Sequence, residues 1–365
     1  RKSIPLSLYS LDAMLDRLRL TEQRVADIVA AVRQVIALPD PVGRVTKMET
    51  RPNGLQIGRK TVPLGVIAII YEARPNVTVD AAALCLKSGN VCILRGSKES
   101  IRSNRCAAAL MRGALESVGL PEDCISLVQD TSRESANELM HLNGYVDVLI
   151  PRGGAGLIRA VAREASVPVI RTGEGVCHIY VDSDANLDMA AEILYNAKCS
   201  RPSVCNAVEC VLIHEAVAAE FLQKAVPLLD RKHVELRCDE ASLKLLGARA
   251  RAAEDADWDA EYDDYILAVH VVRDLDEAME FIAAHSTQHS ECIVTESYAK
   301  AQRFLDEVDA AAVYVNASTR FTDGGEFGMG AEIGISTQKM HARGPMGLEE
   351  LTSYKYIVYG NGQVR

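Results

Sequence analysis

Two continuous apolar runs constrain the fold of this chain more than any other feature of its sequence. Residues 64–70 read Leu-Gly-Val-Ile-Ala-Ile-Ile, and residues 90–94 form a second run, each followed by a helical pattern. A strand is apolar along its whole length when helices cover both faces of its sheet, as in parallel sheets. Strands that alternate with helices predict βαβ units. We therefore expect an α/β fold with a doubly wound sheet.

The alternation restarts after residue 196, which predicts a second α/β domain. Strands are expected in the first half at 146–150, 167–170 and 178–181, and in the second half at 208–214, 266–272, 291–295 and 311–315. The 365 residues are enough for two domains of ordinary size. Two Rossmann-like domains are the expected architecture.

The remaining segments lie outside these units. A helix is expected over Leu6 to Leu20, and Thr21 is placed to cap a second one. The sequence Arg51-Pro-Asn-Gly54 lies between two extended segments, and Asn-Gly is a typical turn of a β-hairpin. An isolated strand at 353–359 is expected to pair either with this hairpin or with a neighbouring subunit.

Composition excludes several classes of protein. The formal net charge of −10 argues against a nucleic-acid-binding protein. No apolar run approaches the roughly 20 residues that span a bilayer, and the first ten residues do not resemble a signal peptide. The ten cysteines form no CxxC pair and no metal-binding spacing, which is typical of a reducing compartment. We expect a cytoplasmic protein without a metal site.

Cys205 is the candidate nucleophile. It lies in the segment 196–207, between a Pro-containing turn and a predicted strand. A thiol on a loop between ordered elements is exposed to substrate yet held in position. For one cysteine taken alone, the alternative of a small buried apolar residue is the commoner one.

Three loops follow predicted strands at their carboxyl ends, where α/β sheets bind ligands. In the loop 71–76, Asn76 either donates a hydrogen bond to an oxyanion or caps the next helix. The loop 95–98 has two cations and a hydroxyl, which either suit a 2′-phosphate or form a solvated turn. The loop 152–156 is either an anion site at a helix N-terminus or a tight turn. The candidate cofactor-binding residues are Arg95, Gly96, Ser97, Lys98, Arg152, Gly153, Gly154 and Gly156.

The order of these motifs resembles a known family. The matching segments are Val62–Val66, Tyr71–Asp80, Ser88–Arg95, Ile150–Leu157, Arg201–Asn206, Val313–Gly325 and Ser336–Gly347. Together they cover nearly the whole chain and resemble the γ-glutamyl phosphate reductases, members of the aldehyde dehydrogenase superfamily. Members usually have more helical sequence ahead of the position of Arg1, so we expect an additional segment there.

The resemblance implies a reaction. The family uses NADPH to reduce L-glutamyl 5-phosphate to L-glutamate 5-semialdehyde, with release of phosphate, in proline biosynthesis. Cys205 would attack as the nucleophile and form a thioester, with Asn76 as the oxyanion donor. The alternative is an oxidising NAD(P)-dependent aldehyde dehydrogenase of the same fold. The resemblance also implies a homo-oligomer and suggests a functional association with glutamate 5-kinase.

Roles for other residues follow from the chemistry of this substrate. Arg201 and Arg320 are candidates to bind its carboxylate, because guanidinium groups bind carboxylates in a bidentate manner. No histidine is marked as a partner of Cys205, so cations such as Arg201 are expected to favour its thiolate. Lys198 or the Gly324-Gly325 backbone would contact the phosphate. Cys199 and Cys210 are expected to be structural, and Glu174 is given no catalytic role.

These roles predict three regions. Residues 1–43 and 63–195 would form the NADP-binding domain, and 196–340 the catalytic domain. Residues 44–62 and 341–365 would form an oligomerisation flap.

Overall fold

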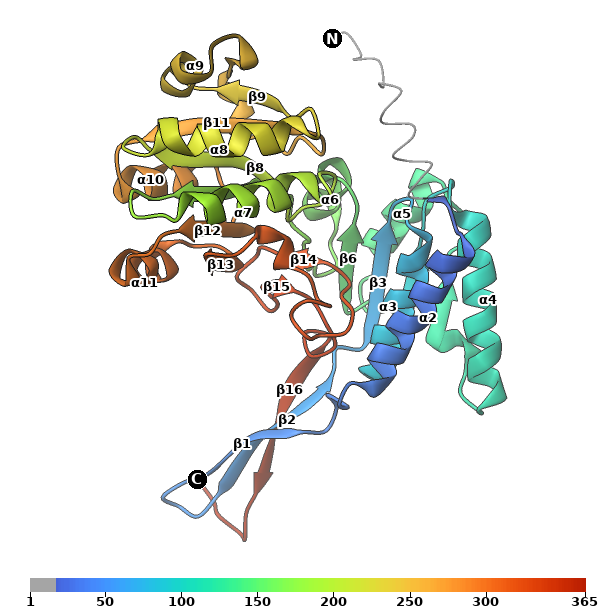
Figure 1. Ribbon diagram of the computed structural model, residues 1–365. Coiled ribbons are helices and arrows are strands. Elements are labelled where there is room, and N and C mark those ends of the chain that lie inside the picture. The colour runs from blue at the N-terminus through green and yellow to red at the C-terminus, as the bar shows by residue number, and fades with distance from the viewer. Residues whose placement is uncertain (1–17) are drawn as a thin grey trace. The chain divides into compact units, whose positions relative to one another are not determined.

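The computed structural model describes residues 18–365, which group into two compact units (Figure 1). The first holds the described residues up to Thr172, with 328–334 and 340–365. The second holds 173–327 and 335–339. The helix expected over Leu6 to Leu20 falls almost entirely outside the described residues. No helix within residues 18–365 is both long and apolar enough to cross a membrane.

The first unit contains a four-stranded parallel sheet in the order β5-β4-β3-β6. Its strands are β3 (Val66–Tyr71), β4 (Val91–Arg95), β5 (Ile125–Leu127) and β6 (Val148–Arg152), and the unit also contains the short strand β15 (Gly344–Pro345). Residues 67–70 of β3 are at most 1% exposed. The prediction that the apolar run is a strand covered on both faces is therefore confirmed.

Five described helices belong to the first unit. They are α2 (Glu22–Ala37), α3 (Pro75–Lys87), α4 (Ile101–Ser117), α5 (Arg133–Met140) and α6 (Ala155–Glu164). Thr21 caps α2 as predicted, accepting a hydrogen bond from the Arg24 N–H at 3.2 Å. The cap of α5 is Ser132, whose side chain accepts a hydrogen bond from the Ser135 N–H. Residues 167–170 make only an isolated bridge, between Val169 and Leu149, because Pro168 has no N–H to donate.

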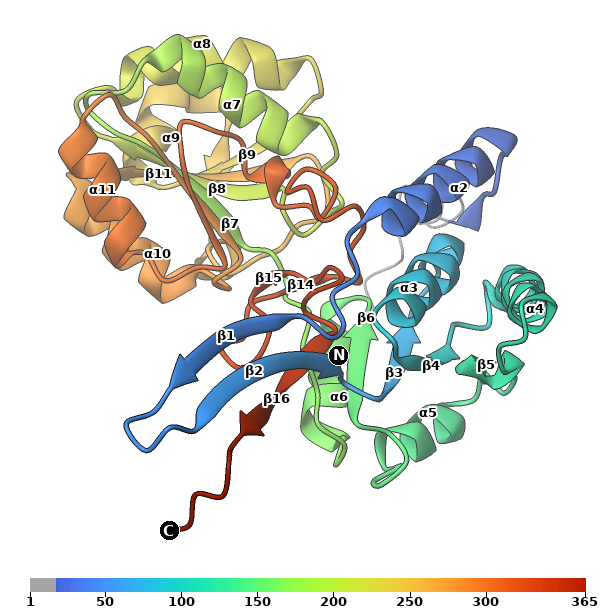
Figure 2. The same cartoon turned by 90° about the horizontal axis from the view of Figure 1, so that it is seen from below.

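The second unit contains a seven-stranded parallel sheet in the order β10-β9-β11-β8-β7-β12-β13. Its strands are β7 (Cys177–Val181), β8 (Val208–His214), β9 (Glu235–Cys238), β10 (Arg251–Ala252), β11 (Ile266–Val272), β12 (Ser290–Val294) and β13 (Ala312–Val315), and the unit also contains β14 (Ile335–Ser336). Its helices are α7 (Leu187–Cys199), α8 (Ala218–Asp230), α9 (Glu240–Leu246), α10 (Leu275–His285) and α11 (Tyr298–Glu307). Figure 2 shows α7 and α8 over one face of this sheet and α10 and α11 over the other.

The boundary between the units differs from the predicted one. Strand β7 lies between β8 and β12 in the second sheet, and α7 packs on that sheet. Residues 173–195 are thus part of the second unit, and the boundary predicted after 195 is wrong. The apolar pattern of 178–181 marks a buried strand, but it carries no information about which sheet the strand joins.

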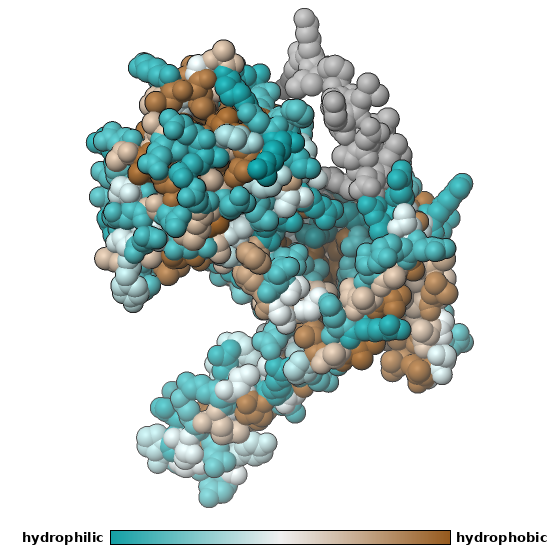
Figure 3. Space-filling view, in the orientation of Figure 1, coloured by the Kyte–Doolittle hydropathy of each residue, from teal (hydrophilic) through white to brown (hydrophobic). Residues whose placement is uncertain are grey.

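A separate three-stranded antiparallel sheet joins β1 (Val45–Thr50), β2 (Gln56–Pro63) and β16 (Thr352–Tyr359). The C-terminal strand therefore pairs with the hairpin, which is one of the two pairings predicted. The sheet extends away from the helices of the first unit and carries mostly hydrophilic residues with a few hydrophobic ones among them (Figures 1 and 3). The predicted flap range 341–365 is too long, since Ala342, Met346, Leu348 and Leu351 are buried in the core of the first unit.

Candidate active site

Cys205 lies on the loop between α7 and β8, at the amino ends of β7 and β8. The residue is partly exposed, whereas Cys199 and Cys210 are buried. Burial raises the pKa of Cys199 to about 11 and that of Cys210 well above its ordinary value, so both remain thiols at neutral pH. Their burial agrees with the structural role predicted for them.

The backbone of Cys205 is held by a second thiol and a glycine. The Cys177 thiol donates a hydrogen bond to the Cys205 carbonyl oxygen at 3.2 Å. A Cβ atom on Gly175 would lie 1.5 Å from the same oxygen, so only glycine fits there. The Gly175 N–H in turn donates to the Glu261 carboxylate at 3.0 Å. These contacts fix the position from which the Cys205 side chain projects.

Asn206 ties the nucleophile loop to the segment around η4 (Thr319–Phe321). Its side-chain amide donates to the carbonyl oxygens of Arg320 at 3.2 Å and Thr322 at 2.9 Å. Its own carbonyl oxygen accepts from the Thr319 hydroxyl at 2.7 Å. Asn206 is buried, so these bonds are shielded from water and hold the two segments in register.

The two predicted substrate-binding arginines belong to the same neighbourhood. The Arg320 guanidinium donates to the Ser200 hydroxyl at 3.1 Å and to the Asn206 side-chain oxygen. Desolvation lowers the pKa of Arg320, and the charge of Arg201 lowers it further, while the charge of Cys205 raises it. Within the second unit, Arg320 thus lies close enough to both the Cys205 thiol and Arg201 for their charges to shift its pKa.

The predicted phosphate contact of Lys198 is wrong. Its side chain is fully buried and its ammonium lies 2.6 Å from the Glu209 carboxylate. A cation held in this way cannot reach a substrate in solvent. At the other predicted position, the Gly325 N–H donates to the Asp323 carboxylate at 2.8 Å.

The loop after β4 keeps one cation exposed. The Arg95 guanidinium donates to the carbonyl oxygens of Thr131 at 2.7 Å and Ser132 at 2.6 Å, so it braces the start of α5. The Lys98 side chain is 80% exposed, and its ammonium lies 4.0 Å from the Glu99 carboxylate. Lys98, rather than Arg95, is therefore the exposed cation of this loop.

A buried hydrogen-bond network supports this loop. The Tyr71 hydroxyl lies 2.7 Å from the Thr78 hydroxyl, which bonds the Asn104 side chain at 3.1 Å. A Cβ atom on Gly96 would lie 2.1 Å from the Asn104 amide nitrogen, so the turn requires glycine. Because the Gly96 backbone lies close to this network, the positions of the next two residues, Ser97 and Lys98, are constrained.

The loop after β6 binds an anion, but that anion is a side chain of the same unit. The Gly154 N–H, at the N-terminus of α6, donates to the Glu72 carboxylate at 2.8 Å. A Cβ atom on Gly153 would lie 2.7 Å from this carboxylate. The helix start thus has the anion-binding chemistry predicted for residues 152–156, and Glu72 uses it.

Asn76 is the second residue of α3, which has Pro75 at its first position. Its side-chain amide donates to the Asp80 carboxylate at 2.9 Å. Burial raises the pKa of Asp80, while this bond and the charge of Arg152 lower it. The predicted role of Asn76 as an oxyanion donor stays a prediction.

Comparison with known proteins identifies the family to which this chain belongs. The model of the aldehyde dehydrogenase family matches residues 16–243. The γ-glutamyl phosphate reductase of Clostridium beijerinckii is 60% identical over 353 residues, which cover 97% of this chain and 85% of that protein. This chain belongs to the γ-glutamyl phosphate reductases of the aldehyde dehydrogenase family. The protein of that name from Halothermothrix orenii is 58% identical, with coverage of 97% and 84%.

Solved structures agree with this family and fold. The crystal structure of γ-glutamyl phosphate reductase from Thermotoga maritima matches with a TM-score of 0.94 at 48% identity, over 97% of this chain and 85% of that one. A propionaldehyde dehydrogenase of Rhodopseudomonas palustris shares the fold with a TM-score of 0.68 at 15% identity, covering 95% and 96%. The predicted fold class and family are therefore confirmed.

Several residues around the predicted loops of the two units escaped sequence reasoning. They are Glu72, Gly175, Cys177, Asn206 and Glu209. A signal existed for Gly175, which lies in the Gly-Glu-Gly sequence 173–175, and for Asn206, which directly follows Cys205. The others are single residues within strands or loops, and only their contacts distinguish them.

Proposed function

We propose that this chain uses NADPH to reduce L-glutamyl 5-phosphate to L-glutamate 5-semialdehyde and releases phosphate, as a step of proline biosynthesis. Relatives that are about 60% identical over 97% of the chain carry the name of this activity. The observation that carries the proposal is the partly exposed Cys205 thiol, held by its backbone beside Arg320.

The proposed mechanism begins with the Cys205 thiolate. It attacks the carbonyl carbon of the acyl phosphate, and the bond from that carbon to the phosphate oxygen breaks, leaving a thioester. Arg201 and Arg320 hold the substrate carboxylate and stabilise the thiolate. The Cys205 backbone N–H donates to the oxyanion. When bound, NADPH supplies the hydride that reduces the thioester carbonyl, and cleavage of the carbon–sulfur bond then frees the aldehyde and restores the thiolate.

The loop after β4 fits the phosphorylated cofactor. Lys98 offers an exposed ammonium and Ser97 a hydroxyl on the turn that Gly96 brings close to the sheet. A cation beside a hydroxyl suits a 2′-phosphate, which NADPH has and NADH lacks. We therefore propose that Ser97 and Lys98 bind the 2′-phosphate, and that the glycines 153, 154 and 156 lie along the rest of the cofactor.

The proposal is tested by the dependence of the reverse reaction on phosphate. With glutamate semialdehyde and NADP⁺, we expect NADP⁺ reduction only when inorganic phosphate is present, since phosphate must cleave the thioester. Turnover without phosphate would instead identify an oxidising aldehyde dehydrogenase. Absorbance at the wavelength of NADPH follows both outcomes in one assay.

Replacing Lys98 with Glu should weaken NADPH binding at least about tenfold and leave NADH binding within about twofold, because one charge-assisted contact to the 2′-phosphate is lost. Fluorescence titration of both cofactors measures the ratio. An exposed cation away from the loop, Lys47 of β1, provides the control for a change of net charge. An unchanged ratio of the two affinities in Lys98→Glu would remove Lys98 from the cofactor site.

We also propose that the chain forms a homo-oligomer through the three-stranded sheet. Strand β16 is an edge of this sheet and exposes Tyr356 and Val358, while Tyr354 packs beneath the Arg59 guanidinium at 3.6 Å. Exposed apolar residues on a sheet edge favour pairing with another chain.

We also propose a cytoplasmic location and a functional association with glutamate 5-kinase, which makes the reactive acyl phosphate.

A further inference from the structure

The nucleophile loop is closed at its base by a buried ion pair. Lys198 lies in the last turn of α7, and Glu209 is the second residue of β8. Their side chains are at most 1% exposed, and the ammonium lies 2.6 Å from one carboxylate oxygen. Because Cys205 lies between them in the chain, the pair joins the two ends of the loop that carries it.

The placement of this pair is not explained by stability. Both charges lose their hydration, and a buried ion pair is often replaced by apolar groups of similar size without loss of stability. In some proteins, however, a buried polar or ionic group enforces one arrangement of the segments that it joins. Here those segments are the end of α7 and the start of β8.

The second carboxylate oxygen of Glu209 is buried without a hydrogen-bond partner among residues 18–365. Burial raises the pKa of Glu209 to about 8, against the opposing charge of Lys198, and the charges of Glu261 and Asp263 raise it further. Burial also raises the pKa of Glu261 to about 7. The Lys198 ammonium lies 5.8 Å from the centre of the Tyr262 ring. The charge of Glu209 also helps to raise the pKa of two buried thiols, Cys177 and Cys210.

We propose that Lys198 and Glu209 are positioning residues, which hold the nucleophile loop so that the Cys205 thiol stays beside Arg201 and Arg320. The inference rests on the proposed function, in which Cys205 is the nucleophile. Ionised Glu209 holds Lys198 tightly, and protonation weakens the hold. The positioning effect is therefore strongest above about pH 8 and declines as the pH falls through that value.

The test uses the double variant Lys198→Met with Glu209→Gln, which keeps the size of both side chains and removes both charges. We expect kcat to fall at least about tenfold at pH 9 and only about threefold at pH 6.5, with KM for the semialdehyde changed less than about threefold. Each kcat is divided by the thiolate fraction of Cys205 in the same protein, because moving the thiol away from the arginines changes that fraction. A wild-type to variant ratio of one at both pH values, or a ratio independent of pH, would overturn the proposal.

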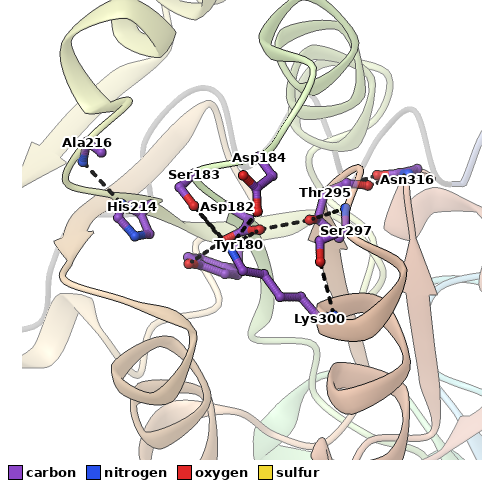
Figure 4. Close-up of polar contacts among 10 residues, drawn as sticks. All are labelled: Tyr180, Asp182, Ser183, Asp184, His214, Ala216, Thr295, Ser297, Lys300 and Asn316. Atoms are coloured by element: carbon purple, nitrogen blue, oxygen red, sulfur yellow. Dashed lines mark hydrogen bonds and ion pairs between the residues drawn. The ribbon is translucent and has the colours of Figure 1, made fainter.

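A matched control lies at the opposite, carboxyl edge of the same sheet. Asp182, buried after β7, accepts two bonds from the Lys300 ammonium at 3.0 Å, and Asp184 accepts a third at 2.7 Å (Figure 4). The double variant Lys300→Met with Asp182→Asn removes a pair of the same two charges, less buried on the lysine side, away from the nucleophile loop. We expect its kcat to match that of the wild type at both pH values. A loss equal to that of the loop variant would show a general effect of charge removal and contradict the proposal.

A second measurement separates this proposal from the reaction itself. Iodoacetamide labelling of Cys205, resolved by mass spectrometry, needs no substrate. We expect the double variant of Lys198 and Glu209 to be labelled about threefold more slowly than the wild type at pH 7, where an ordinary thiol is mostly protonated, because its thiol leaves the two arginines. If the wild type shows no phosphate-dependent turnover but the double variant is still labelled more slowly than the wild type, the positioning role is retained and the reaction is rejected.

Unchanged labelling and kcat in an active enzyme would reject the positioning role alone. If the double variant does not fold, Glu209→Asp carries the same test, because it keeps the charge and withdraws the carboxylate by one methylene group. We expect its kcat to fall in the same direction, and a wild-type kcat would overturn the proposal.

Discussion

Replacing Cys205 with Ser is expected to abolish turnover, lowering kcat at least about 10³-fold. A serine hydroxyl stays protonated at neutral pH. The charges of Arg201 and Arg320, which would stabilise a thiolate, cannot make the hydroxyl a comparable nucleophile. The affinity for NADPH should remain within about twofold of the wild type, because the cofactor loops belong to the first unit. Steady-state kinetics and fluorescence titration measure the two effects.

The control for this change is Cys106→Ser on α4, an exposed cysteine in the first unit. Its activity should equal that of the wild type. Turnover retained by Cys205→Ser would exclude a thioester on this residue. Loss of NADPH binding in the same variant would show instead that the substitution disturbs the fold.

Replacing Gly175 with Ala is expected to have the second largest effect. The new Cβ atom would lie 1.5 Å from the Cys205 carbonyl oxygen, and that neighbour is backbone, so the nucleophile loop must shift. A displacement of about 1 Å at a reacting group lowers kcat by about 10²-fold. Overpacking of this kind also costs about 1–3 kcal/mol of unfolding free energy. Kinetics and denaturant unfolding measure the two quantities separately.

A glycine with open surroundings provides the comparison. Gly113 lies inside α4, and a Cβ atom there would meet nothing within 4 Å. Gly113→Ala should therefore stabilise the chain by about 0.5–1 kcal/mol, as alanine does in a helix interior, and leave kcat unchanged. Wild-type kcat in Gly175→Ala would show that the loop tolerates displacement and that its backbone contacts do not position Cys205.

Most strands could be predicted because their signal is local. The apolar run 64–70 and the segment 208–214 become β3 and β8 almost residue for residue. The run 167–170 failed because Pro168 cannot donate to a ladder, a local fact that the apolar pattern concealed. The assignment of β7 failed for a different reason, since strand pairing depends on where distant segments meet.

The sites divide in the same way. Cys205 could be singled out from its loop context and its family motif, and the glycine turn at Gly96 from its place after a buried strand. Lys198 could not be judged from sequence, because its partner Glu209 is recognisable only once α7 packs on β8. The same holds for Glu72, whose carboxylate reaches Gly154 across 82 residues.

The sequence by itself therefore determined the α/β class and the family, and it predicted the nucleophile and cofactor loops. Apolar periodicity, glycine turns and family motifs are properties of residues that are neighbours in the sequence, so they can be recognised without knowledge of the fold. Only the tertiary structure decided which sheet contains β7, which cations are buried, and which groups hold the Cys205 backbone. Those outcomes depend on desolvation and on hydrogen-bond partners that only folding brings together.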